Sequence, residues 1–156
     1  MLQQLKKRNS GFTIIEVLIV LAIAGLIMVV VFLAVPNLQR NARNNQTKTE
    51  ANNLLAAYQE VSDNAGGSVL VSTDNTAVTT AANLKTITAA NVSITSTIPA
   101  TVATPSAAPT TYAYFYTGAK CTAQNSNVPV AGTARQAALF YWIETPGSTQ
   151  VQCINT

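Results

Sequence analysis

The chain has 156 residues, of which 48% are hydrophobic and only 10% charged, and its net charge is +3. Three of the nine basic residues lie at positions 6–8, and the other six are scattered and balance the six acidic residues, so no basic cluster of the kind that binds nucleic acid is present. The sequence has no histidine, the commonest general base and metal ligand. Composition therefore argues against a nucleic-acid-binding protein, and nothing in it indicates an enzyme, a metal site or a cofactor.

An apolar segment at residues 12–35 is the first element of the chain. At about 1.5 Å of rise per residue, a helix of this length spans about 36 Å, more than the roughly 30 Å of a bilayer's hydrocarbon core. The segment is therefore predicted to be a transmembrane helix. Glu16 lies inside it, and an ionisable group in such a helix is costly to bury and indicates a functional site.

The basic residues at positions 6–8 precede the apolar segment, which places residues 1–11 in the cytoplasm and the rest of the chain outside. One interpretation is a secretory signal peptide cleaved after Ala22-Ile23-Ala24. That cleavage would leave a glutamate within the apolar part of the signal and an apolar stretch at the new terminus. A second interpretation is an uncleaved signal anchor, which leaves Glu16 without a role.

The stretch Gly11-Phe12-Thr13-Ile14-Ile15-Glu16, after a short basic leader, resembles the class III signal of type IV pilins and pseudopilins. The resemblance is close over residues 6 to 35 and only architectural beyond them. It implies that a prepilin peptidase cleaves the chain between Gly11 and Phe12 on the cytoplasmic side and that the new Phe12 amine is N-methylated. Residues 1–11 are then the leader, and residues 12–35 are a transmembrane and polymerisation helix.

The resemblance also gives Glu16 a role in assembly. The new α-amino group of Phe12 has an ordinary pKa of about 8 and is largely cationic at neutral pH. Glu16 of an incoming subunit is expected to pair with the Phe12 amine of a subunit already in the filament, because two charges that are each costly in an apolar core are tolerable as a pair. The alternative that Glu16 neutralises the terminus of its own chain stays open.

Two residues are expected to make the helix flexible. Gly25 lowers local helix propensity by about 1 kcal/mol relative to alanine, although it equally suits close packing against another helix. Pro36 removes an amide donor and predicts a kink. Members of the family often place this proline three residues earlier, where the present chain has Leu33.

The rest of the chain is predicted to form one modest head. Residues 36–65 continue the helix as an amphipathic second half, whose apolar residues recur at helical spacing and suit packing under a sheet. Residues 66–110, rich in Thr, Ala and Ser, form a variable connection with one or two short strands. Residues 111–156 form an antiparallel β-sheet with a disulfide-bounded C-terminal region, in which the runs at 136–144 and 149–154 make a hairpin.

The two cysteines, Cys121 and Cys153, are both predicted to lie outside the membrane. An even pair of cysteines in an exported domain indicates a disulfide, which for a loop of this length stabilises the fold by about 3 to 4 kcal/mol.

The sequence thus predicts an α+β pilin fold with a long N-terminal helix packed on a C-terminal antiparallel sheet. The resemblance implies a structural subunit of a type IV pilus: a precursor in the cytoplasmic membrane that the inner-membrane assembly machinery polymerises into an extracellular filament for adhesion, twitching motility or DNA uptake. One alternative is a pseudopilin of a type II secretion or competence system. The dispersed acids, which are unsuited to binding calcium, count modestly against the major pseudopilins of secretion systems. The other alternative, from a different class, is a monomeric membrane-anchored binding module.

Overall fold

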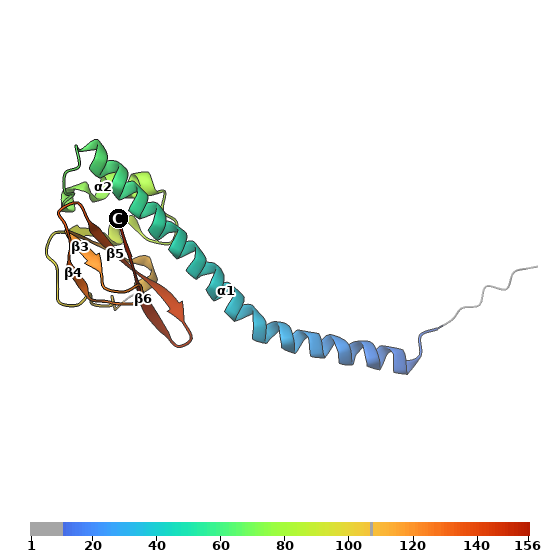
Figure 1. Cartoon of the computed structure of the whole chain (residues 1–156). Coiled ribbons are helices and arrows are strands. Elements are labelled where there is room, and N and C mark those ends of the chain that lie inside the picture. The colour runs from blue at the N-terminus through green and yellow to red at the C-terminus, as the bar shows by residue number, and fades with distance from the viewer. Residues whose placement is uncertain (1–10, 107) are drawn as a thin grey trace, which may run out of the picture. The chain divides into compact units, whose positions relative to one another are not determined.

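The computed structural model describes residues 11–106 and 108–156 and divides into two compact units, Met1–Gln39 and Arg40–Thr156. One helix, α1 (Ile14–Asn64), contributes to both units (Figure 1). The described part of the first unit is α1 as far as Gln39, with the three residues that precede the helix. The second unit, which we call the head, contains the end of α1 and all the other elements. The basic residues expected to orient the chain lie in the leader, outside the described residues.

The head combines a second helix with a four-stranded and a two-stranded sheet. Helix α2 spans Asn75–Ala82, and three short 3-10 helices lie at Ser72–Asp74, Ala89–Asn91 and Pro109–Thr111. The strands are β1 (Val92–Thr95), β2 (Ala113–Thr117), β3 (Ala119–Cys121), β4 (Pro129–Ala131), β5 (Ala137–Thr145) and β6 (Ser148–Asn155).

The main sheet has the strand order β1-β2-β5-β6, and a separate hairpin pairs β3 with β4. Strands β5 and β6 form an antiparallel hairpin closed by Pro146 and Gly147, with Glu144 opposite Thr149. Strand β5 also pairs antiparallel with β2, whereas β1 pairs parallel with β2. The sheet is therefore antiparallel except at β1.

The second half of α1 covers one face of this sheet (Figure 1). Its buried apolar residues are Ala51, Leu54, Ala57 and Tyr58, which recur at helical spacing and pack with residues of α2, β1, β2 and β5. The Tyr58 ring stacks on Phe115 of β2 at 5.0 Å between ring centroids. The predicted apolar stripe of the helix therefore forms one side of the main core.

A second core lies on the opposite face of the sheet. Phe140 and Trp142 of β5 are fully buried there, together with Val102 from the chain after β1 and Ala119 of β3. Because β5 is buried on both faces, its sequence is an uninterrupted apolar and aromatic run rather than an alternating one.

Helix α1 ends at two glycines in the left-handed region. The Gly67 amide donates to the Ser62 carbonyl and the Gly66 amide to the Asp63 carbonyl, and φ is +74° at Gly66 and +75° at Gly67. These bonds form a Schellman motif, which satisfies carbonyls at the end of the helix.

The predicted fold class, a long N-terminal helix on an antiparallel-rich sheet, is confirmed. Within the connection at 66–110, only Val92–Thr95 becomes a strand, and α2 was not predicted from the sequence. The predicted hairpin is present as β5 and β6. The parallel pairing of β1 was also not predicted, because a four-residue strand carries no sequence signal for its partner or direction.

Candidate functional site

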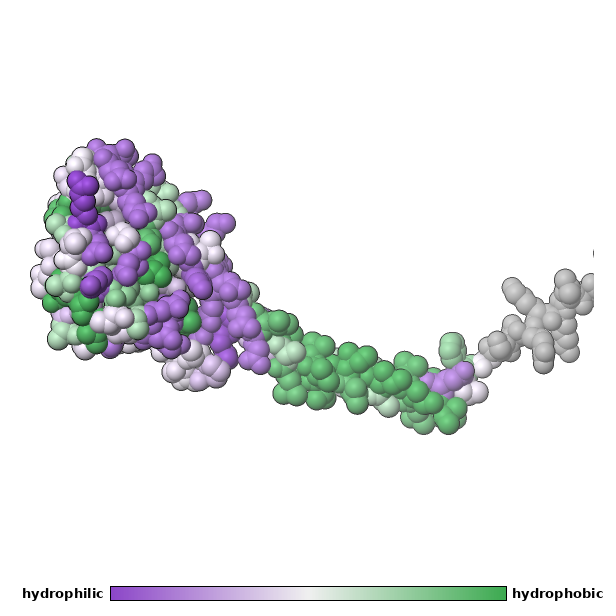
Figure 2. Space-filling model, viewed as in Figure 1, coloured by the Kyte–Doolittle hydropathy of each residue, from purple (hydrophilic) through white to green (hydrophobic). Residues whose placement is uncertain are grey.

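The surface of α1 in the first unit is almost wholly apolar. Figure 2 shows a largely hydrophobic surface along this part of the helix, with a hydrophilic patch near its start. Its large apolar side chains are exposed, for example 82% at Ile14, 48% at Val17 and 72% at Leu33. Helix α1 is long and apolar enough to cross a membrane. An exposed apolar surface of this size in water would be an association or membrane site.

Glu16 lies in the first turn of this helix and forms a capping box with Thr13. Its carboxylate accepts hydrogen bonds from the Thr13 amide at 2.8 Å and from the Thr13 hydroxyl at 2.7 Å. The Glu16 amide in turn donates to the Thr13 hydroxyl oxygen at 3.4 Å. A threonine at the N-cap with a glutamate three residues later satisfies two amides that would otherwise lack partners at a helix start.

This contact shows that Glu16 has a partner within its own chain. In this uncleaved chain the partner is Thr13, and the Thr-x-x-Glu spacing that encodes the contact is visible in the sequence. Pairing of Glu16 with a Phe12 amine, of its own chain or of a neighbour, stays a prediction. The capping contact was not predicted from the sequence, because a glutamate in an apolar helix was expected to need a positively charged partner. The capping box does not neutralise the carboxylate, so the cost of placing its charge in an apolar layer remains.

Gly11 and Phe12 precede the helix in an irregular segment. Phe12 is 90% exposed, and among the described residues nothing beyond the chain neighbours of Gly11 lies within 4 Å of the position its side chain would take. Phe12 and Glu16 also line one apolar hollow of about 580 Å³, together with Val17 and Val20. Among the described residues nothing covers the peptide bond between Gly11 and Phe12, and Glu16 shares a surface with the residue that follows that bond.

Gly25 and Pro36 both lie inside α1, which continues through them. Gly25 has open space on its side-chain side, so no other described residue of the chain packs closely against it. The flexibility expected at these two positions stays a prediction.

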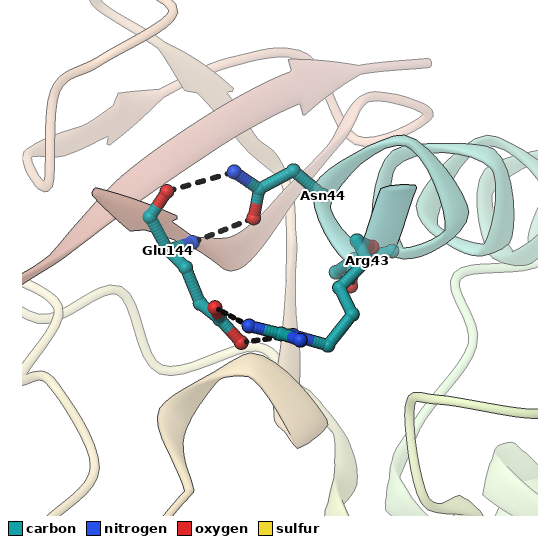
Figure 3. A network of polar contacts seen from close by, with 4 residues as sticks. Arg43, Asn44 and Glu144 are labelled. Atoms are coloured by element: carbon teal, nitrogen blue, oxygen red, sulfur yellow. Dashed lines mark hydrogen bonds and ion pairs between the residues drawn. The ribbon is translucent and has the colours of Figure 1, made fainter. Parts of the chain in front are cut away.

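In the head, a polar network ties α1 to the β5–β6 hairpin (Figure 3). The Arg43 guanidinium donates two hydrogen bonds to the Glu144 carboxylate, at 2.9 and 2.6 Å. The Asn44 side chain binds the backbone of Glu144, donating to its carbonyl and accepting from its amide, both at 2.7 Å. The bonds from Arg43 lower the pKa of the Glu144 carboxyl.

Asn44 takes the place of a neighbouring strand. The pairing of β2 with β5 ends at Tyr141, so the Glu144 backbone on that side has no strand partner. The Asn44 amide supplies one acceptor and one donor in the spacing of a β-ladder. The network therefore completes the edge of β5 and fixes the hairpin against the helix.

Glu50 is the second polar attachment of α1, and its side chain is only 4% exposed. Its carboxylate accepts hydrogen bonds from the Thr86 amide at 2.7 and 2.8 Å, from the Ile87 amide at 2.7 Å and from the Gln46 side chain at 3.2 Å. Burial alone would raise the pKa of this carboxyl, but the hydrogen bonds outweigh burial and lower it. Glu50 therefore stays ionised and holds the loop after α2.

Cys121 of β3 and Cys153 of β6 form a disulfide, with a Cα–Cα distance of 5.8 Å and a sequence separation of 32. Cys153 is buried in the second core. Among residues 11–106 and 108–156, no group of three or more His, Cys, Asp or Glu side chains is placed to hold a metal ion.

Comparison with known families identifies the N-terminal region. The prokaryotic N-terminal methylation motif matches residues 6–32, which include Gly11, Phe12 and Glu16. No curated protein and no solved structure matches the chain. The motif and the long apolar helix define a membrane-anchored precursor with a class III signal. Residues 6–32 therefore carry the N-terminal methylation motif of type IV pilin-like proteins, a class that covers both pilins and pseudopilins.

Proposed function

We propose that this chain is the structural subunit of a type IV pilus. Prepilin peptidase would remove the leader between Gly11 and Phe12, Phe12 would be N-methylated, and the assembly machinery of the inner membrane would polymerise the mature subunit into an extracellular filament. Adhesion, twitching motility or DNA uptake would follow as activities of that filament. The observation that carries the proposal is an ionisable Glu16 on an exposed apolar helix, four residues after Phe12, which is the first residue after the proposed cleavage bond.

The exposed apolar surface supports polymerisation through α1. In the precursor the bilayer covers this surface, and in a filament neighbouring helices would cover it instead. A packed bundle of helices excludes water, so Glu16 would then need an opposite charge. The Phe12 amine of a neighbouring subunit is suited to that role because cleavage creates it close to the start of the same helix.

The capping box makes it possible to separate two roles of Glu16. A glutamine at this position retains a side-chain oxygen for the Thr13 amide and therefore preserves the cap, but it carries no charge. An alanine at position 13 removes the capping hydroxyl and keeps the charge. We therefore expect Glu16→Gln to reach the membrane and be processed but to fail in filament assembly, and Thr13→Ala to assemble.

The assay is electron microscopy and immunoblotting of fibres sheared from producing cells, with membrane fractions as the measure of subunit supply. Assembly by Glu16→Gln at the level of the unchanged chain would refute the charge pairing. Loss of assembly in both variants, with normal membrane levels, would assign Glu16 to helix capping instead.

N-terminal sequencing of the mature protein tests the processing step. We expect the mature chain to begin at an N-methylated Phe12. A chain that begins at Met1, or after Ala24, would contradict the proposal.

Fibre length separates the remaining candidates. A pseudopilin would be processed identically but would yield only short assemblies at its natural level. A monomeric binding module would yield no fibres.

A further inference from the structure

Strand β6 lies at one end of the main sheet, whose strand order is β1-β2-β5-β6. Its inner edge pairs with β5 over its whole length, Ser148–Asn155. In an antiparallel pair, alternate residues direct their amide and carbonyl groups to opposite edges of the strand. The Cys153 amide points outward, because it donates to the Gln124 carbonyl at 2.7 Å. The same alternation places the backbone groups of Val151 and Thr149 on the outer edge.

The loop after β3 covers the second half of this outer edge. Besides the bond from Cys153, the Asn155 side chain accepts a hydrogen bond from the Cys121 amide at 2.6 Å. The Gln152 side chain donates to the Asn125 side chain at 2.8 Å. The outer edge of residues 152–155 is therefore occupied by the chain itself.

The first half of the outer edge is open. No described residue bonds to the Thr149 amide, the Thr149 carbonyl or the Val151 amide. The Val151 carbonyl accepts a hydrogen bond only from the side chain of the next residue, Gln152, at 3.0 Å. We call Thr149–Val151 the open edge of β6.

Proteins usually protect a free strand edge with a charged side chain, a proline or a β-bulge. The open edge has none of these, since residues 147–156 contain no charged side chain and no proline and the register with β5 is continuous. The end of β5, by contrast, is covered by the Asn44 amide. An unprotected edge of this kind is a template for a strand of another chain.

Charge and spacing both favour a second copy of this chain as the partner. Pairing of two identical strands brings like residues close together, so a charge on the strand would face its own copy and repel it. The absence of charge from β6 removes that repulsion. In an antiparallel register centred on Gln150, Thr149 of each copy lies opposite Val151 of the other, and each such pair exchanges two backbone hydrogen bonds.

We propose that β6 pairs antiparallel with β6 of a second copy through Thr149–Val151, which joins the two four-stranded sheets into one continuous sheet. So short an edge buries far less than the roughly 1,200 Å² of a stable interface, so a single pair associates weakly. Pairs that form side by side between two arrays of subunits add their affinities.

This contact is different from the one that builds a filament. Pairing centred on Gln150 has two-fold symmetry, whereas neighbours within a filament are related by a rotation and a translation. The open edge therefore joins two precursors in the membrane or, if the proposed function holds, two separate filaments. The inference goes beyond the proposed function and does not depend on it.

Gln150→Cys tests the register. The Gln150 side chain is half-buried and makes no hydrogen bond with another described residue, so the change is mild. In the proposed pair the two copies of position 150 lie opposite each other with Cα atoms about 4.5 Å apart, which a disulfide can bridge. We expect a covalent dimer on non-reducing gels of membranes and of sheared fibres from producing cells after mild oxidation, and its conversion to monomer by reductant.

Ser148→Cys is the matched control, because Ser148 is more exposed and lies on the same strand. In the proposed register its two copies are four residues apart along the strand, about 13 Å, which is beyond the reach of a disulfide. We expect at least about tenfold less dimer from this variant. Equal yields from the two variants would show random collision and overturn the inference, as would the absence of a dimer from both fractions of Gln150→Cys.

Thr149→Pro, added to the Gln150→Cys chain, tests whether backbone pairing brings the copies together. The Thr149 amide bonds to no described residue, and proline is tolerated on an edge strand where the amide faces outward. We expect the dimer yield to fall at least about fivefold, with an unchanged unfolding midpoint by Trp142 fluorescence. An unchanged yield would overturn strand pairing.

Fibre counts keep this inference separate from the proposed function. Normal fibres without any dimer from Gln150→Cys would refute the edge pairing alone. A dimer in membranes of cells that make no fibres would refute the filament alone.

Discussion

The carboxylate of Glu50 offers a direct test of how α1 holds the loop after α2. We consider Glu50→Gln, which keeps the size of the side chain and removes its charge. The remaining oxygen can still accept from the Thr86 and Ile87 amides, but the new NH2 group then faces the Thr86 amide and the Gln46 side-chain amide, which donated to the lost oxygen. The change therefore removes charge-assisted hydrogen bonds at a side chain that is only 4% exposed.

Hydrogen bonds to charged groups contribute about 1.5 to 3 kcal/mol each, and an adjacent polar hollow lets water replace part of what is lost. We therefore expect the free energy of unfolding to fall by about 2 kcal/mol. For a head of 117 residues, Arg40–Thr156, the unfolding entropy is about 0.25 kcal/mol per kelvin, so the midpoint temperature should fall by about 8 °C.

The fluorescence of Trp142 measures this transition in the full chain in detergent. It is the single tryptophan of the chain and is fully buried in the head. Glu60→Gln is the matched control, because Glu60 is an exposed acid on the same helix. Surface substitutions of this kind usually change stability by less than about 0.5 kcal/mol.

The effect should depend on pH. Because the pKa of Glu50 is lower in the folded head than its ordinary value of about 4.3, its contribution is fully present above that value and is lost as the pH falls through the folded pKa. The difference in free energy of unfolding between the unchanged chain and Glu50→Gln should be constant from about pH 5 to about pH 7 and should shrink below about pH 4. An equal difference at pH 3 and pH 7, or none at pH 7, would refute the reasoning.

Three further predictions use the same fluorescence assay. Asn44→Ala should lower the free energy of unfolding by about 1 to 2 kcal/mol, because it leaves the Glu144 amide and carbonyl without partners. Asn45→Ala is the control and should be neutral. Equal effects of the two variants would contradict the role of Asn44 as a substitute for a strand. Replacing Cys153 and its bonded partner by serine should cost about 3 to 4 kcal/mol, and a smaller loss would mean that the second core alone holds β6. Gly66→Ala should cost about 1 kcal/mol or more because φ is +74°, and an unchanged midpoint would place the end of the helix elsewhere.

Two sets of contacts were not predicted from the sequence: the polar network at Glu144, and the hydrogen bonds that attach Glu50 to the loop after α2. Arg43 and Glu144 are separated by 101 positions, and only the folded hairpin brings them together. Glu50 gave a weak signal, since it is an acid beside the apolar stripe that includes Ala51 and Leu54. A helix pattern shows that such a position is buried, but the amides that compensate the charge come from a distant loop.

The connection at 66–110 was predicted least well. Its short apolar runs all have strand-like composition, yet only Val92–Thr95 joins the sheet. The stretch that becomes α2, Asn75–Ala82, is rich in threonine and weak in helix propensity. Packing of Val78 and Ala82 into the main core, and not local preference, decides that it is helical.

The sequence alone determined the features that depend on local pattern. The motif at 6–32, the apolar helix with Glu16 inside it, and the β5–β6 hairpin are each encoded by neighbouring residues whose spacing matches a helix, a cap or a turn. Tertiary structure decided the parallel placement of β1, the second core and the compensation of Glu50 and Glu144. These features depend on contacts between residues far apart in the chain, and such contacts stabilise the head only once it has folded.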